Sequence, residues 1–107
     1  MSLKLTLHKK AFDVMVTGEK NIEYRNPSKW IKSRLFNKDK QKKFYNFIEF
    51  TNGYGKDKPY FKAKYNNFYI SNDINKTYSN GLKIIRKEDT YCIKIGQIIK
   101  IQNYTLN

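Results

Sequence analysis

The alternation of apolar and charged residues in the second half of the chain constrains the fold most. One segment starts with a regular alternation of Phe61, Lys62, Ala63, Lys64 and Tyr65. A period of two places successive side chains on opposite faces of a β-strand. We therefore expect strands over residues 60–71, 82–85 and 91–101. Residues 44–51 predict a further strand, apolar on both faces.

Two of these strands carry signals for irregular pairing. The apolar phase changes at Phe68, so Asn66 and Asn67 predict a bulge. Gly96 interrupts the last strand and predicts a second bulge or bend, which a small closed barrel requires. The polar stretch 71–80 predicts a loop.

The first third of the chain mixes short helices and strands. Residues 3–7 alternate as a strand, and residues 9–17 predict a short helix that ends at Gly18. Residues 20–25 return to period two, with Ile22 and Tyr24 expected to face inward and Glu23 and Arg25 to share the opposite face.

A second helix is expected after Asn26-Pro27. Asn26 is a suitable helix cap and Pro27 a suitable first helical residue. The helix is expected to end near Leu35, with Trp30, Ile31 and Leu35 on its buried side.

These elements predict an α+β fold, a small β-barrel of about six strands with two short helices. The 107 residues fit a single domain, 1–107. No apolar run approaches the 18 residues of a membrane span, so we expect a cytoplasmic domain that does not act at a membrane. With one cysteine and one histidine, the chain predicts no metal site, no internal disulfide and no cofactor.

Charge points to a polyanionic partner. The chain has 22 Lys plus Arg against 9 Asp plus Glu, a formal net charge of +13. Such an excess attracts polyanions in a salt-dependent way, and nucleic acid is the partner that this charge favours. The oligomeric state stays open.

The segment from Gly18 to Arg25 is the most distinctive one. It places Lys20, Glu23 and Arg25 where a helix cap turns into a strand. Such a cluster of opposite charges can hold the polar edge of a ligand, or tune a lysine for general-base chemistry. The alternative is an ion-pair network that only pins the strand.

The pattern Gly18-x-Lys20-x-x-Glu23-x-Arg25 resembles the Gly-x-Lys-x-x-Glu-x-Arg signature of ASCH domains, which belong to the PUA-like β-barrel superfamily. Residues 91–99 are similar to the closing strands of that family. The resemblance implies a PUA-like barrel whose cleft, beside the motif, binds RNA or a modified nucleoside.

Some ASCH domains are enzymes. In the amidohydrolase type, the motif lysine is a base and a threonine three residues later is the nucleophile. Lys20 matches the lysine, but Glu23 stands in place of the threonine, and a carboxylate cannot be activated as an alkoxide can. The hydrolytic glutamate of those enzymes has no clear counterpart here, and Glu49, Glu88 and Asp89 are the candidates.

A basic stretch offers a separate contact surface. It contains Lys56, Lys58, Tyr60, Lys62 and Lys64. Lysines contact phosphates, and an exposed tyrosine stacks on bases. Five or six such contacts to a single strand predict a slope of about −4 for log affinity against log salt. The alternative is an ordinary charged outer face of a strand.

The leading hypothesis is nucleic-acid binding, RNA ahead of DNA, in a cleft near Lys20, Glu23 and Arg25 flanked by the basic strands. The second is a small hydrolase acting on a modified nucleoside or RNA, with Lys20 and Glu23 as catalytic base and acid. The third is a basic module that binds an acidic protein.

Overall fold

A curled five-stranded sheet wraps around two short helices in this computed structural model, which describes residues 1–105. The strand order across the sheet is β1 (Ser2–Leu7), β3 (Phe47–Asn52), β4 (Tyr60–Ser71), β7 (Thr90–Gln102) and β2 (Ile22–Arg25). The β1–β3 pair is parallel and the other pairs are antiparallel. The sheet is a half-barrel, with β1 and β2 as its two edges.

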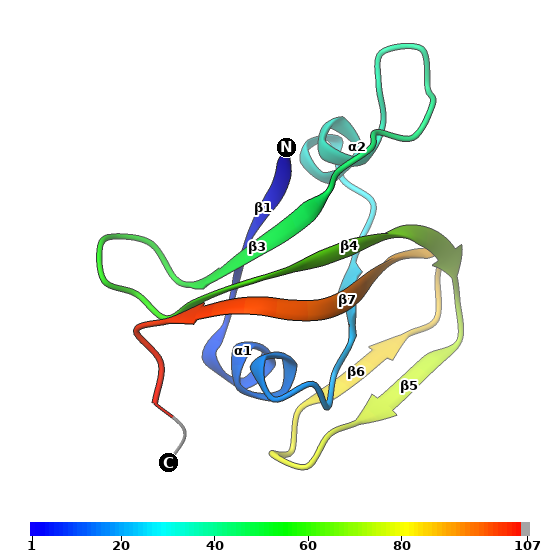
Figure 1. Ribbon diagram of the computed structural model, residues 1–107. Helices are drawn as coiled ribbons and strands as arrows, with labels where there is room; N and C mark the ends of the chain where they lie inside the picture. Colours follow the sequence, from blue (N-terminus) through cyan, green and yellow to red (C-terminus); the bar gives the residue numbers. More distant parts are fainter. Residues whose placement is uncertain (106–107) are drawn as a thin grey trace.

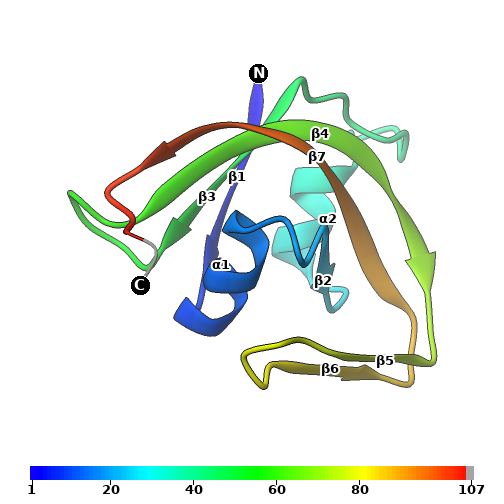
Figure 2. The same cartoon turned by 60° about the horizontal axis from the view of Figure 1, so that its bottom comes forward.

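Helices α1 (Lys9–Val16) and α2 (Lys29–Leu35) lie under the arch of the sheet, as Figure 2 shows. Strands β5 (Ile74–Thr77) and β6 (Lys83–Arg86) form a separate hairpin (Figure 1). No helix in the described part of the chain is long and apolar enough to cross a membrane.

The concave side of the sheet holds the main core. Phe12 of α1 is fully buried against Phe61, with ring centroids 5.3 Å apart, and Phe50 packs against the same ring. Alternate residues of β1, β3 and β4 face this core, which is the cause of the period-two pattern. Burial of these aromatic side chains therefore ties α1 to the sheet.

Several local predictions are confirmed. Strand β4 has the expected bounds, and its register with β7 shifts between Tyr65 and Phe68, where Asn67 has a φ of 71°. The register shifts again beside Gly96, where a Cβ would come within 2.9 Å of the side-chain nitrogen of Asn66. Both bulges let the two longest strands bend around the core.

The prediction of one barrel of about six strands is only partly right. Among residues 1–105 the fold is α+β with two short helices, but its seven strands form a five-stranded half-barrel and a hairpin. Residues 71–80 were expected to be a loop, yet they include β5. Only Ile74 of that strand is buried, so pairing with β6 creates a strand that has no alternating pattern.

The expected strand at 44–51 starts later and is not buried on both faces. It begins at Phe47, whereas Phe44 is 93% exposed. Phe47 and Glu49 are only half-buried because they lie on the outer face of the sheet.

The start of α2 was also predicted wrongly. Ser28, not Asn26, is the cap, because its side-chain oxygen accepts a 3.1 Å hydrogen bond from the Ile31 amide. Ile31 and Leu35 are buried as expected, but Trp30 is 48% exposed.

The inward face of β2 is the reverse of the expected one. Glu23 pairs with Ile93 and so faces the main core, whereas Tyr24 pairs with Cys92 on the other side. There Tyr24 packs with Cys92 and Ile74 in a second, smaller cluster beneath the hairpin. Both faces of β2 are covered, so its apolar residues do not identify the main core.

The cap assignment gives a stability prediction. Ser28→Ala removes the acceptor for the Ile31 amide, so we expect the free energy of unfolding to fall by about 1 kcal/mol in urea denaturation. Asn26→Ala is the matched control and is expected to be nearly neutral. Equal losses in the two variants would contradict the assignment.

Candidate functional site

The motif residues are brought together by a tight turn between α1 and β2. Gly18 has a φ of 88°, a conformation that glycine adopts without strain, and its amide donates to the Met15 carbonyl. The Lys20 amide then donates to Val14. The turn therefore folds Lys20 back beneath α1, at the start of β2.

Lys20, Glu23 and Arg25 form one chain of ion pairs. The Lys20 ammonium donates to one Glu23 carboxylate oxygen at 2.9 Å, and the Arg25 Nε donates to the other at 2.8 Å. Glu23 and Arg25 share a face of β2 because they are two residues apart. Each oxygen of the buried carboxylate thus has its own basic partner.

The Lys20 side chain is fully enclosed. None of its surface is exposed, and its ammonium also donates to the Ile22 carbonyl at 2.6 Å and contacts the Met15 sulfur at 3.5 Å. An ammonium with three protons has no further donor to offer. Lys20 therefore holds Glu23 in place and does not present its charge to a ligand.

Arg25 links the two edges of the half-barrel. One of its terminal nitrogens donates at 2.7 Å to the carbonyl of Thr6, on edge strand β1. Unpaired edge carbonyls are costly unless they find a donor. This hydrogen bond spans the gap between β1 and β2, and the Arg25 side chain is still a quarter exposed to solvent.

A cleft of about 480 Å³ opens at this gap. One wall is formed by β1, β2 and the start of α1, and the other by the β5–β6 hairpin and the turn after β3. The basic residues that line it are Lys10, Arg25 and Arg86, whereas the enclosed Lys20 beside it is balanced by Glu23. The lining is therefore net positive, and it suits an anionic group.

Arg86 faces the cleft from the hairpin wall. Its Nε is buried and has no hydrogen-bond partner among residues 1–105, and one terminal nitrogen donates to the Ile85 carbonyl. A buried donor without a partner is rare in proteins and costs free energy. The Arg86 guanidinium nevertheless brings a positive charge to the hairpin wall of the cleft.

The other predicted contact residues lie outside the cleft. Lys56 and Lys58 are exposed in the β3–β4 connection, and Lys62 and Lys64 lie on the outer face of β4. The Lys62 ammonium sits 4.4 Å from the centre of the Phe47 ring. Tyr60 lines a neighbouring hollow. The predicted contact residues, the three motif residues and these five, thus occupy more than one surface.

Sequence reasoning missed the hairpin wall and Tyr54. Tyr54 lies in the Asn52–Gly55 turn and lines the cleft, although it was not chosen as a contact residue. Arg86 was one of only three arginines in a chain rich in lysine, which was the available signal. Its place in the same cleft as Arg25 depends on pairing of the hairpin, which no local pattern shows.

Within residues 1–105, no three His, Cys, Asp or Glu side chains gather closely enough to hold a metal ion. Glu49 lies on the outer face of β3, and Glu88 and Asp89 are exposed before β7, so none of them lines the cleft.

No protein-family model, curated protein or solved structure matches the chain.

The ion-pair chain predicts a large stability effect. Glu23→Gln leaves Lys20 and Arg25 without a counter-charge, so we expect the free energy of unfolding to fall by about 3–5 kcal/mol. Lys9→Ala is the control: it breaks the exposed Lys9–Asp13 pair, which has the same 2.9 Å separation as the Lys20–Glu23 pair, and should be close to neutral. If the two variants lost similar amounts of unfolding free energy in urea denaturation, burial of the Lys20–Glu23–Arg25 ion pairs would not be what makes them important for stability.

Proposed function

We propose that this protein is a PUA-like domain of the ASCH type that binds single-stranded nucleic acid, RNA ahead of DNA, in the cleft between the half-barrel and the hairpin. The observation that carries the proposal is that Arg25 and Arg86 line one net-positive cleft from two different sheets. The motif that resembles ASCH domains lies at this cleft, as that family's binding mode requires.

Arg25 has donors left for a phosphate. A guanidinium carries five N–H groups, of which Glu23 and the Thr6 carbonyl each take one. The remaining three can bind phosphate oxygens or a base edge, and Glu23 fixes their direction. Arg86 adds a second guanidinium from the opposite wall.

Apolar side chains complete the cleft. Leu82 and Ile84 line the hairpin wall and Ala11 lines the other. A sugar or the face of a base packs against such surface while the arginines hold the phosphate. The combination suits a nucleotide better than a bare inorganic anion.

The lysines outside the cleft have a general role in this proposal. Lys56, Lys58 and Lys64 are exposed and attract the phosphate backbone without reading sequence. Their contribution weakens as salt is added, in keeping with the net charge of +13.

The hydrolase alternative gains no support from this arrangement. A general base needs a free lone pair near the substrate, but the Lys20 ammonium is enclosed and spends its protons on Ile22 and Glu23. Glu23 is likewise held by two basic partners. We therefore propose binding without turnover.

Removal of Arg86 tests the proposal. We expect Arg86→Ala to weaken binding of a fluorescein-labelled eight-nucleotide single-stranded RNA by about tenfold, as for loss of a hydrogen bond to a charged group. Fluorescence anisotropy at about 50 mM salt, where electrostatic attraction is strong, measures the affinity.

Lys83→Ala is the matched control, because Lys83 has the same charge on the same strand but does not line the cleft. It should change affinity by less than about twofold, as for loss of one distant screened charge. If the two variants weakened RNA binding equally, the affinity would come from overall positive charge and not from the cleft. Absence of detectable binding to RNA and to DNA of the same sequence would refute nucleic-acid binding and leave the protein-interaction alternative.

A further inference from the structure

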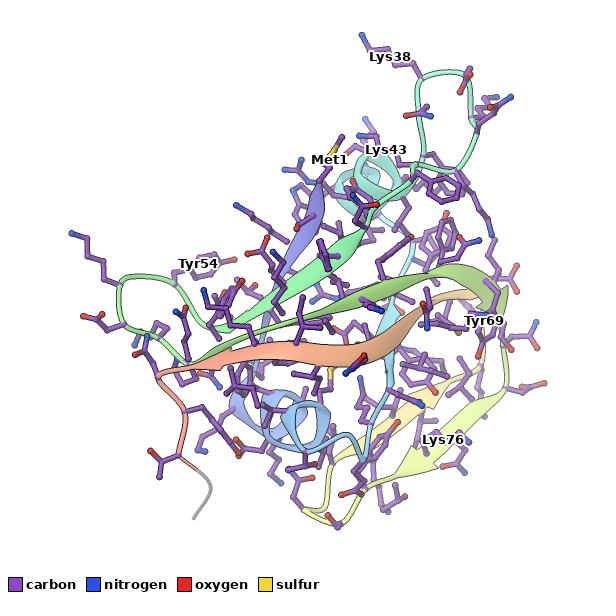
Figure 3. The ribbon with its side chains drawn as sticks, in the orientation of Figure 1. Met1, Lys38, Lys43, Tyr54, Tyr69 and Lys76 are labelled. Carbon is purple, nitrogen blue, oxygen red and sulfur yellow. The ribbon has the colours of Figure 1, made fainter. Side chains whose placement is uncertain are left out.

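A second hollow, of about 370 Å³, adjoins the cleft at the edge of β1. Thr6 and Tyr54 line both spaces, so the hollow and the cleft lie next to each other. Figure 3 shows Tyr54 on the connection between β3 and β4, on the side of β1. We call the cleft and the adjacent hollow together the edge groove.

The hollow is aromatic. Trp30 from α2, Tyr54 from the β3–β4 connection and Tyr60 from β4 all line it. Trp30 is 48% exposed and Tyr54 is 83% exposed. Large rings left in water next to one another mark a binding surface, because burial of each would be favourable.

Two of the rings are held in place. The Arg34 guanidinium lies 5.1 Å from the centre of the Trp30 ring, and it adds positive charge to that ring's surroundings. The Tyr60 hydroxyl donates a 2.6 Å hydrogen bond to Glu49. Burial and this hydrogen bond raise the pKa of Tyr60 to about 12, so its ring stays neutral at physiological pH.

The charged residues of the hollow favour a base over a phosphate. Lys4 lines it and attracts phosphate, whereas the Glu49 carboxylate repels phosphate and is already engaged by Tyr60. Burial opposes ionisation of Glu49, but the Tyr60 hydrogen bond and the nearby Lys4 and Lys62 outweigh it and lower its pKa. A base, which carries no charge, is therefore the group that fits among the rings.

We propose that the edge groove binds two consecutive nucleotides of a single strand. The first lies in the cleft with its phosphate between Arg25 and Arg86, and the base of the second stacks in the hollow on Trp30 and Tyr54. Stacking needs an unpaired base, so the groove selects single strands over duplexes. This inference rests on the proposed function and specifies its ligand as a dinucleotide unit.

A comparison of one nucleotide with two tests the inference. Trp30 is the only tryptophan of the chain, so its fluorescence reports on the hollow directly. We expect the 5′-phosphorylated uridine dinucleotide to bind at least about fivefold more tightly than uridine 5′-monophosphate, since one stacked base contributes about 1–3 kcal/mol. The dinucleotide should quench the tryptophan fluorescence, and the mononucleotide should not.

Trp30→Ala should abolish this gain and leave the mononucleotide affinity, measured by calorimetry, unchanged. Trp30→Phe should restore most of the gain. Phe44→Ala is the control, because Phe44 is 93% exposed but does not line the groove, and it should alter neither affinity.

The outcomes separate the two proposals. If both ligands bind equally and Arg86→Ala weakens both, the cleft stands and the two-nucleotide groove is wrong. If a gain persists in Trp30→Ala, the second nucleotide lies elsewhere and the inference is equally wrong. If neither ligand nor the eight-nucleotide RNA binds, nucleic-acid binding itself is refuted and the inference falls with it.

Discussion

A buried carboxylate lies between two basic side chains, one of which connects the open edges of this sheet. Glu23 faces the core of the half-barrel, where an unpaired charge would be costly, and Lys20 and Arg25 each neutralise one of its oxygens. Arg25 then reaches across to the Thr6 carbonyl of the opposite edge strand. A half-barrel has two such edges, and this bridge connects them by side-chain chemistry in place of a strand pair.

Structural and functional explanations of the charged motif are therefore compatible. Lys20 and Glu23, the buried members of the ion-pair chain, stabilise the fold, since the Lys20 ammonium and both Glu23 oxygens already have hydrogen-bond partners. The outer end is Arg25, whose guanidinium still reaches the cleft with donors to spare. The same bridge that completes the fold sets the direction of the group that would meet a ligand.

Features determined by neighbouring residues could be predicted from the sequence. The bounds of β4, its bulge at Asn67 and the irregularity at Gly96 follow from local alternation and its interruptions. The grouping of Lys20, Glu23 and Arg25 follows from a glycine turn and the period of a strand. The inward face of β2 did not follow, because it depends on the hairpin, whose residues lie some fifty positions later. The place of Arg86 in the same cleft as Arg25 could not be predicted for the same reason.

The wall that carries Arg86 is a separate piece of structure. The β5–β6 hairpin is docked through the small cluster around Tyr24, Ile74 and Cys92, and its turn is tethered by hydrogen bonds from Ser79 to the Glu19 carboxylate and from Asn80 to the Lys10 carbonyl. The spacing between the two arginines is thus set by docking and not by a continuous sheet. An anion held by both would clamp the hairpin against the half-barrel. Amide hydrogens of the hairpin would then exchange more slowly in the complex, while those in the middle of β3 would stay as they were. The bound anion would in this way supply part of the rigidity of its own site.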